Sequence, residues 1–185
     1  MKNTGDKMLL GTTKLLELVK TINLVENLCE RELKTPEGAG FDLRLGNVYQ
    51  LTGSGFIGIT HRKTPERRLV VEYGKDSKII IDPGQYFIGQ TIEKINLPSN
   101  ITAFFGPRIT TYMNGLIVRI GLTAKPGSSS NINFAISNQG PVPVEIELGS
   151  RLIHVSFCKV DGLVNQYKGQ WKGNRTGTPG MEKQI

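Results

Sequence analysis

The chain has 185 residues, of which 38% are hydrophobic and 21% are charged, and its formal net charge is +7. This length and apolar content are enough for one ordinary hydrophobic core, which predicts a single domain over residues 1–185. The longest apolar runs are far too short to span a bilayer and the N-terminus lacks a hydrophobic signal core, so we expect a cytoplasmic protein without a membrane partner.

The N-terminal segment, residues 1–39, contains one helical pattern. Gly11-Thr12-Thr13 precedes leucine and valine residues that recur at near-helical spacing as far as Ile22. This pattern predicts one short helix within Leu9–Leu28.

From Gly40 onward the pattern changes to short β-rich runs. Turn dipeptides such as Pro83-Gly84 and Pro126-Gly127 separate these runs. The regular alternation of strands and turns predicts an all-β sandwich or barrel over residues 40–161, with Greek-key or jelly-roll connections. A turn at Thr110–Asn114 is the one helical interruption, which argues against a doubly wound α/β fold. The predicted strands are 48–51, 56–60, 69–73, 78–81, 86–95, 101–105, 116–122, 132–137, 142–146 and 151–160.

Residues 162–185 form a polar tail without apolar periodicity, which predicts a flexible segment. Basic residues gather in this tail at 168–175 and also at 61–68. The positive charge favours an anionic partner without choosing between a nucleotide and a nucleic acid. Tyr167 and Trp171 are the aromatic residues interleaved in the tail, so a solvated basic surface explains the charge as well as a nucleic-acid patch does.

The sequence offers little for metal chemistry. Its two histidines are His61 and His154, and its two cysteines, Cys29 and Cys158, lie far apart. A zinc-dependent nucleobase deaminase needs an H-x-E element and a P-C-x-x-C element, and the chain has neither. We therefore expect no metal site and no tightly bound cofactor.

Three segments resemble the dCTP deaminase and dUTPase family in their order and spacing. They are G-F-D-L-R-L-G at 40–46, the run from Pro83-Gly84 through Q-T-I-E at 90–93, and I-N-F-A-I-S-N at 132–138. The resemblance covers nearly the whole chain. It implies a dUTPase-like distorted β-barrel or jelly roll with a short N-terminal helix and a C-terminal tail, residues 162–185, that acts as a lid. It also implies a homotrimer with a nucleotide site between subunits.

Both carboxylates that the family uses as catalysts are missing. Where family deaminases carry the catalytic glutamate, this chain has Ala135, and where the I-D-P-G element carries an aspartate, it has Lys125. A positioned general base contributes on the order of 10²- to 10⁴-fold in rate, and a methyl group cannot accept a proton. We therefore assign no catalytic residue in this chain. A glutamate restored at position 135 is expected on the inward face of its strand, flanked by Asn133.

The triphosphate-binding segment of the family, G-R-S-S-x-x-R-x-G, is only partly matched by residues 106–115. Arg108 is retained, while Ile109 and Met113 replace a serine and the second arginine, which removes most of the charge-assisted bonds. His154 replaces a phosphate-contacting glutamine. The nucleotide-binding set that the resemblance implies is Arg108, Thr110, Thr111, Thr123, Ala124, His154, Tyr167, Lys168 and Gln170, and Mg²⁺ would accompany a bound triphosphate.

These observations predict a catalytically degenerate homologue that binds or senses a deoxypyrimidine nucleoside triphosphate. Asp42, in the D-L-R element, is interpreted as a carboxylate that braces a strand turn. Two alternatives stay open. One is an active dCTP deaminase or dUTP diphosphatase with a relocated base, for which Glu93, Glu145 and Asp161 are the carboxylates near the motifs. The other is a nucleic-acid or protein interaction module on this fold.

Overall fold

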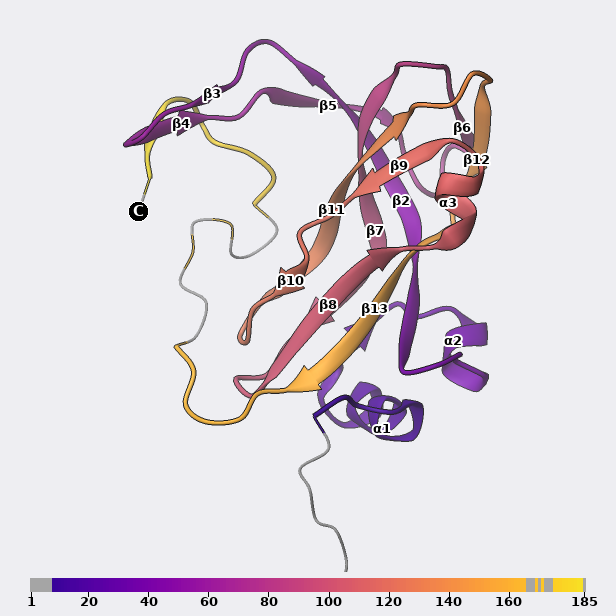
Figure 1. The fold of residues 1–185 in the computed structure, drawn as a ribbon, viewed down its shortest axis with the longest axis vertical. Helices are drawn as coiled ribbons and strands as arrows, with labels where there is room; N and C mark the ends of the chain where they lie inside the picture. Colours follow the sequence, from indigo (N-terminus) through magenta and orange to yellow (C-terminus); the bar gives the residue numbers. More distant parts are fainter. Residues whose placement is uncertain (1–7, 166–168, 170, 172–174, 185) are drawn as a thin grey trace, which may run out of the picture.

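The structure is a computed structural model that describes residues 8–165, 169, 171 and 175–184. β-Strands are the main secondary structure of the described residues, as expected, and the three helices are short (Figure 1). The helices are α1 (Thr12–Ile22), α2 (Glu30–Lys34) and α3 (Ile109–Met113). The strands are β1 (Val25–Glu26), β2 (Gly40–Thr52), β3 (Phe56–Ile57), β4 (His61–Lys63), β5 (Glu66–Val71), β6 (Lys78–Ile81), β7 (Tyr86–Asn96), β8 (Ile101–Pro107), β9 (Leu116–Arg119), β10 (Thr123–Ala124), β11 (Ser129–Asn138), β12 (Val144–Glu147), β13 (Arg151–Lys159) and β14 (Glu182–Lys183).

Nine strands form one curled sheet, which follows the order β10-β8-β13-β2-β7-β11-β9. Strand β1 pairs with β7 and β5 pairs with β2, outside this path. The pair β12-β6 and the triplet β14-β4-β3 form two smaller sheets. All the strand pairs between named strands are antiparallel, and the long central strands β2, β7 and β13 connect the two halves of the curl (Figure 1).

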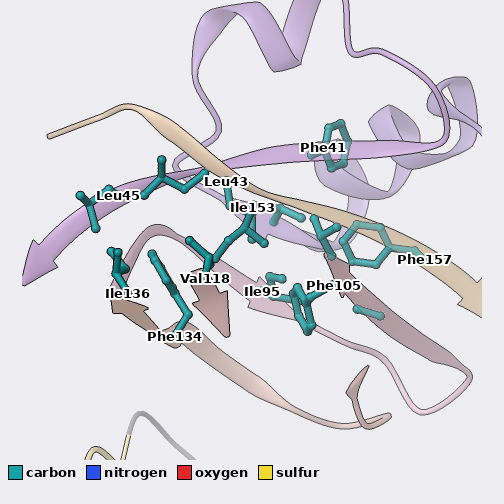
Figure 2. Packing of buried hydrophobic residues seen from close by; sticks show 14 of the residues in the cluster. Phe41, Leu43, Leu45, Ile95, Phe105, Val118, Phe134, Ile136, Ile153 and Phe157 are labelled. Carbon is teal, nitrogen blue, oxygen red and sulfur yellow. The ribbon is translucent and has the colours of Figure 1, made fainter. Parts of the chain in front are cut away.

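The hydrophobic core fills the inside of this curl. Figure 2 shows side chains from β2, β7, β8, β9, β11 and β13 meeting there, with the rings of Phe41 and Phe157 in edge contact at 6.2 Å between centroids. Leu15 of α1 is fully buried and closes one end of the core. Helix α1 lies within the predicted range Leu9–Leu28 and is shorter, because Asn23 ends it in the left-handed conformation at φ 51°.

Strand β11 turns its alternate residues to two different faces. Phe134, Ile136 and Asn138 are buried, whereas Ala135 is half-exposed with Asn133 on the other face. The expectation that position 135 faces inward is therefore wrong. The pairing of β11 with β7 is irregular between Asn131 and Asn133, and from Asn133 onward the alternation turns Phe134 and Ile136 into the core.

The end of the tail packs against the β3–β4 hairpin. Glu182 of β14 pairs with Arg62 of β4 and forms an ion pair with it at 2.8 Å. Thr178 and Thr64 exchange two hydrogen bonds between main-chain nitrogens and hydroxyls, of 2.8 and 3.0 Å. The described part of the predicted flexible tail thus contains one short strand.

None of the described helices is long and apolar enough to cross a membrane.

A buried ion pair joins the central strands β2 and β7. Glu93 is fully buried; its Oε1 accepts from Arg44 Nε at 2.6 Å and its Oε2 accepts from the main-chain nitrogen of Arg44 at 2.8 Å. Arg44 also donates to the carbonyl of Asn27 at 2.5 Å. Burial raises the pKa of Glu93, although the bonds from Arg44 act in the opposite direction. Removing one partner would leave the other charge poorly compensated.

We therefore expect Glu93→Gln to lower the free energy of unfolding by about 3–5 kcal/mol, the usual cost of breaking a buried pair. Glu145→Gln is the matched control, because Glu145 pairs with Lys78 on the surface with both side chains about half exposed. The control should cost less than about 1 kcal/mol. Urea unfolding measures both changes, and equal losses in the two variants would contradict the structural role of the buried pair.

Candidate functional site

Asp42 is the centre of a charged cluster at one end of the curled sheet. His154 Nδ1 lies 2.9 Å from Asp42 Oδ1, and Arg108 and Arg151 place Nη1 atoms 3.1 and 3.2 Å from Asp42 Oδ2. The main-chain nitrogen of Asp42 donates to Glu32 Oε2 at 3.0 Å. We call these five residues the charged cluster; it joins α2, β2, β13 and the start of α3.

The charged cluster supports the interpretation of Asp42 as a bracing carboxylate. Strand β13 pairs with β2 on one side and with β8 on the other. His154 of β13 is opposite Asp42 of β2 and Gly106 of β8, so the contacts of Asp42 lie where the three strands meet. Burial alone would raise the pKa of Asp42, but the hydrogen bond from His154 and the charges of Arg108 and Arg151 outweigh it and hold that pKa below its ordinary value. Asp42 is therefore ionised at neutral pH and neutralises part of the positive charge beside Arg108.

A cavity of about 600 Å³ opens beside the charged cluster. Arg108, Arg151, Thr110 and Thr111 line it, together with Glu145 of β12. Thr111 is buried, and its hydroxyl donates to the carbonyl of Arg108 at 2.6 Å. A hydroxyl has one proton to donate, so in this state Thr111 has none left for a phosphate oxygen.

A second cavity, of about 500 Å³, lies beside the turn after β10. We call it the hairpin pocket. Its lining combines the hairpin residues with parts of β5, β8, β11 and the tail. The described residues that line it are Arg67, Phe105, Ile120, Gly121, Thr123, Ala124, Lys125, Ser128, Ser130, Asn131, Ile132, Asn133, Trp171 and Arg175.

Asn133 and Arg67 are in direct contact in the hairpin pocket. Asn133 Oδ1 accepts from Arg67 Nη1 at 3.2 Å and from Gln90 Nε2 at 3.4 Å. Burial lowers the pKa of Arg67, which remains far above neutral. Ala135 is the next residue on the same face of β11, directly opposite Ile88 on one side and Arg119 on the other.

The tail contributes an aromatic residue to the hairpin pocket. The guanidinium carbons of Arg62 and Arg175 lie 4.7 and 5.5 Å from the ring centroid of Trp171. Such cation–π contacts favour an arginine over the indole face. Glu182 forms ion pairs with both arginines, so β14 fixes the two cations that hold Trp171.

The described lining of the hairpin pocket contains three cationic side chains and no aspartate, glutamate, histidine or cysteine. The three carboxylates considered as relocated bases do not line it. Glu93 is bound by Arg44 inside the sheet, Glu145 lines the other cavity, and Asp161 is exposed after β13. The described residues also contain no group of three or more histidine, cysteine, aspartate or glutamate side chains that could hold a metal ion.

The two halves of the predicted nucleotide site lie apart within one chain. Ala124 pairs with Ala103 on β8, five residues before Arg108. With a strand rise of about 3.3 Å per residue, this separation is roughly 16 Å. In Figure 1, β10 lies beside the middle of β8, and α3 follows the end of β8.

The structure thus divides the predicted site residues into three groups. Arg108, Thr110, Thr111 and His154 belong to the charged cluster or its cavity, and Thr123 and Ala124 line the hairpin pocket. Tyr167, Lys168 and Gln170 lie outside the described residues.

Sequence reasoning missed Arg67, Asn133, Arg151 and Trp171 as contributors to these two regions. The sequence predicts a solvated basic surface for the run at 61–68 and a lid for the tail that contains Trp171. Strand register, which the sequence does not encode locally, decides that Arg67, Asn133 and Arg151 line cavities, whereas Trp171 lies in the tail and lines the hairpin pocket from there.

The comparisons with known proteins agree with this fold and identify the family. The model of the dCTP deaminase-like family matches residues 9–160, so the chain belongs to that family. It is 26% identical over 152 residues to the dCTP deaminase of Pyrococcus furiosus, covering 82% of this chain and 85% of that one. It is 31% identical over 137 residues to the dUMP-forming dCTP deaminase of a Sulfurihydrogenibium species, covering 72% and 76%.

A solved structure shows the same fold. The 2'-deoxycytidine 5'-triphosphate deaminase of Agrobacterium tumefaciens superposes with a TM-score of 0.65 at 19% identity, covering 85% of this chain. This chain spans half the length of that enzyme. The distorted β-barrel of the dCTP deaminase and dUTPase type is therefore confirmed.

The depressed pKa of Asp42 predicts a pH dependence of stability. A carboxyl whose pKa is lower in the folded state stabilises the fold above its unfolded pKa of about 3.9, and this contribution is lost as the pH falls through the folded value. We expect Asp42→Asn to be less stable than the unmodified protein by about 1–3 kcal/mol at pH 7, with the difference narrowing below about pH 4. Asp161→Asn, at an exposed position, is the control. A difference that stays constant from pH 7 to pH 2 would exclude Asp42 as its source.

Proposed function

We propose that this protein binds a deoxypyrimidine nucleoside triphosphate without deaminating or hydrolysing it, and that it acts as a binding or regulatory member of deoxypyrimidine nucleotide metabolism. One observation carries the proposal. The described lining of the hairpin pocket provides cations and amides but no group that accepts a proton near neutral pH, and Ala135 occupies the position of the family's catalytic glutamate.

The chemistry of the family supports this proposal. Deamination at C4 of cytosine and cleavage at the α-phosphate both need a water that a carboxylate activates. Without a positioned base the rate falls by on the order of 10²- to 10⁴-fold. Arginine, lysine, asparagine and threonine side chains can still orient a nucleotide, so binding does not depend on the missing group.

The charges of the two regions suit a triphosphate. Arg67, Lys125 and Arg175 line the hairpin pocket, and Arg108 and Arg151 line the cavity of the charged cluster. Asp42 contacts both arginines of that cluster, so a phosphate has to share them with a carboxylate. We infer that affinity for the phosphates is lower than in relatives with a second arginine at position 113. Mg²⁺ would accompany the triphosphate, and the cytoplasmic location expected from the sequence remains part of the proposal.

The distance between the two regions supports a site built between subunits of a homotrimer. Ala124 and Arg108 lie about 16 Å apart along one chain, and a neighbouring copy that brought its charged cluster to the hairpin pocket would shorten the span between base and phosphates. Apolar side chains beside this region support such packing. Ile109, Tyr112 and Met113 of α3 are exposed, as is Leu122.

The two alternatives have weaker support. An active enzyme needs a relocated base, and Glu93, Glu145 and Asp161 do not line the hairpin pocket. A nucleic-acid module would bind through the basic run at 61–68 and the tail, where Glu182 already neutralises part of the charge of Arg62 and Arg175. The binding role is therefore favoured over both the active enzyme and the nucleic-acid module.

The first test of the proposal combines turnover and binding. With Mg²⁺ present, we expect no ammonia from dCTP and no pyrophosphate from dUTP above background, together with calorimetric heat of nucleotide binding. Ammonia or pyrophosphate release that follows the protein through purification would refute the loss of catalysis. Absence of heat with every deoxypyrimidine triphosphate would refute the binding role.

Ala135→Glu tests whether one carboxylate restores the chemistry. The new side chain would lie across from Arg119, which makes no ion pair within the described part of the chain. A partner of opposite charge directly across an antiparallel pair is favourable, so we expect a loss of stability below about 1 kcal/mol. Ile109 and Met113 are unchanged, and we expect no measurable deamination. Ammonia release by this variant would show that the rest of the site is intact.

The second test concerns assembly. Light scattering at micromolar concentration should give a mass near three times 20.4 kDa. Met113→Glu, which places a charge on the exposed apolar face of α3, should lower this mass. Ile80→Glu, at an exposed apolar residue of β6, is the matched control and should leave it unchanged. A clean monomer in the unmodified protein would remove the shared site.

A further inference from the structure

The amide of Asn133 has a fixed orientation in the hairpin pocket. A guanidinium group can only donate hydrogen bonds, so the Asn133 atom that Arg67 Nη1 contacts at 3.2 Å must be the oxygen. Gln90 Nε2 points to the same oxygen at 3.4 Å. Rotating the amide by half a turn would place an NH₂ group against the guanidinium, donor against donor. The contact with Arg67 therefore decides which end of the amide remains for a ligand.

The nitrogen end of that amide is not fully buried. Asn133 Nδ2 has no hydrogen-bond partner among the described residues, and no fully buried side-chain nitrogen or oxygen in the described part of the chain lacks a partner. Nδ2 is therefore accessible to solvent in the pocket that Asn133 lines. It presents two protons to whatever enters.

The main chain before Asn133 is held in place by β7. Asn131 Nδ2 lies 3.1–3.2 Å from the carbonyls of Thr91, Ile92 and Glu93, and the main-chain nitrogen of Ile132 donates to Thr91 Oγ1 at 2.9 Å. These bonds fix the irregularity in the pairing of β11 with β7. Asn133 is consequently presented by a rigid element, which makes its donor group effective for discrimination.

The other charged groups of the pocket have the same character. Arg67, Lys125 and Arg175 can only donate, whereas the hydroxyls of the lining can donate or accept. Uracil and thymine carry a carbonyl oxygen at C4, and cytosine carries an amino group there. The hydrogen-bond donors of Asn133 and of these three cations match the C4 carbonyl oxygen and oppose the C4 amino group.

We propose that Asn133, held by Arg67, makes the hairpin pocket selective for the keto pyrimidines uracil and thymine over cytosine. The inference rests on the proposed function, because it requires that the nucleotide base enters this pocket. The preferred bases therefore differ from cytosine, the base of the substrate named for the dCTP deaminase relatives. A donor that faces another donor loses its hydrogen bond, so we expect dUTP and dTTP to bind about 10- to 100-fold more tightly than dCTP.

The test is calorimetric titration of the full chain with dUTP, dTTP and dCTP, each in the presence of Mg²⁺. Asn133→Ala removes the donor and should bring the three dissociation constants to within a few-fold of one another, chiefly by weakening dUTP and dTTP. Asn133→Asp replaces the open NH₂ with an acceptor of the same shape and should shift the preference towards dCTP. Asn100→Asp adds the same charge at an exposed position outside the pocket, and should keep the original ratio.

The outcomes separate this inference from the proposed function. If the unmodified protein binds dCTP as tightly as dUTP, or if Asn133→Ala keeps the original ratio, the selectivity is wrong and nucleotide binding still stands. If none of the three nucleotides binds, or if any is converted, the proposed function itself fails. Thermal unfolding of each variant shows that it is folded, and the ratio in the unmodified protein tests the selectivity without any variant.

Discussion

The segment Thr91–Glu93 of β7 holds both neighbouring strands in place, and the candidate site depends on it. On one side the Glu93 carboxylate binds the side chain and main chain of Arg44 in β2. On the other side the carbonyls of this segment bind Asn131, and Thr91 binds the nitrogen of Ile132 in β11. A buried charge is costly unless it is fully paired, so this arrangement tolerates little change. It fixes the direction in which the next residues of β11 point.

One face of β11 can change its side chains without a change in the framework. Ala135 and Asn133 share a face of β11, away from the core that Phe134 and Ile136 fill. A change of side chain on that face alters what the pocket can do and leaves the core packing untouched. Asp42 is the corresponding feature of the charged cluster, since it contacts both Arg108 and Arg151. Buried groups thus keep the framework in place.

The sequence predicts the class of fold and most strands, because alternation along β7, β8 and β13 is strong and turn dipeptides separate the runs. It misses α2, which is too short to show a helical period, and β14, which pairs with β4 some 120 residues away. It places Ala135 on the wrong face, because the alternation along β11 turns Phe134 and Ile136 into the core instead. Family motifs located Arg108 and the hairpin, but the contact of Arg67 with Asn133 depends on register across three strands.

A crystal structure grown with dUTP and Mg²⁺ tests the central claim most directly. The account predicts density for an intact triphosphate, with the C4 oxygen of uracil at hydrogen-bond distance from Asn133 Nδ2 and the phosphates at Arg108 of a neighbouring copy. Density for dUMP would show that the protein is a catalyst after all. A base bound outside the hairpin pocket, or one that avoids Asn133, would contradict the account of the site.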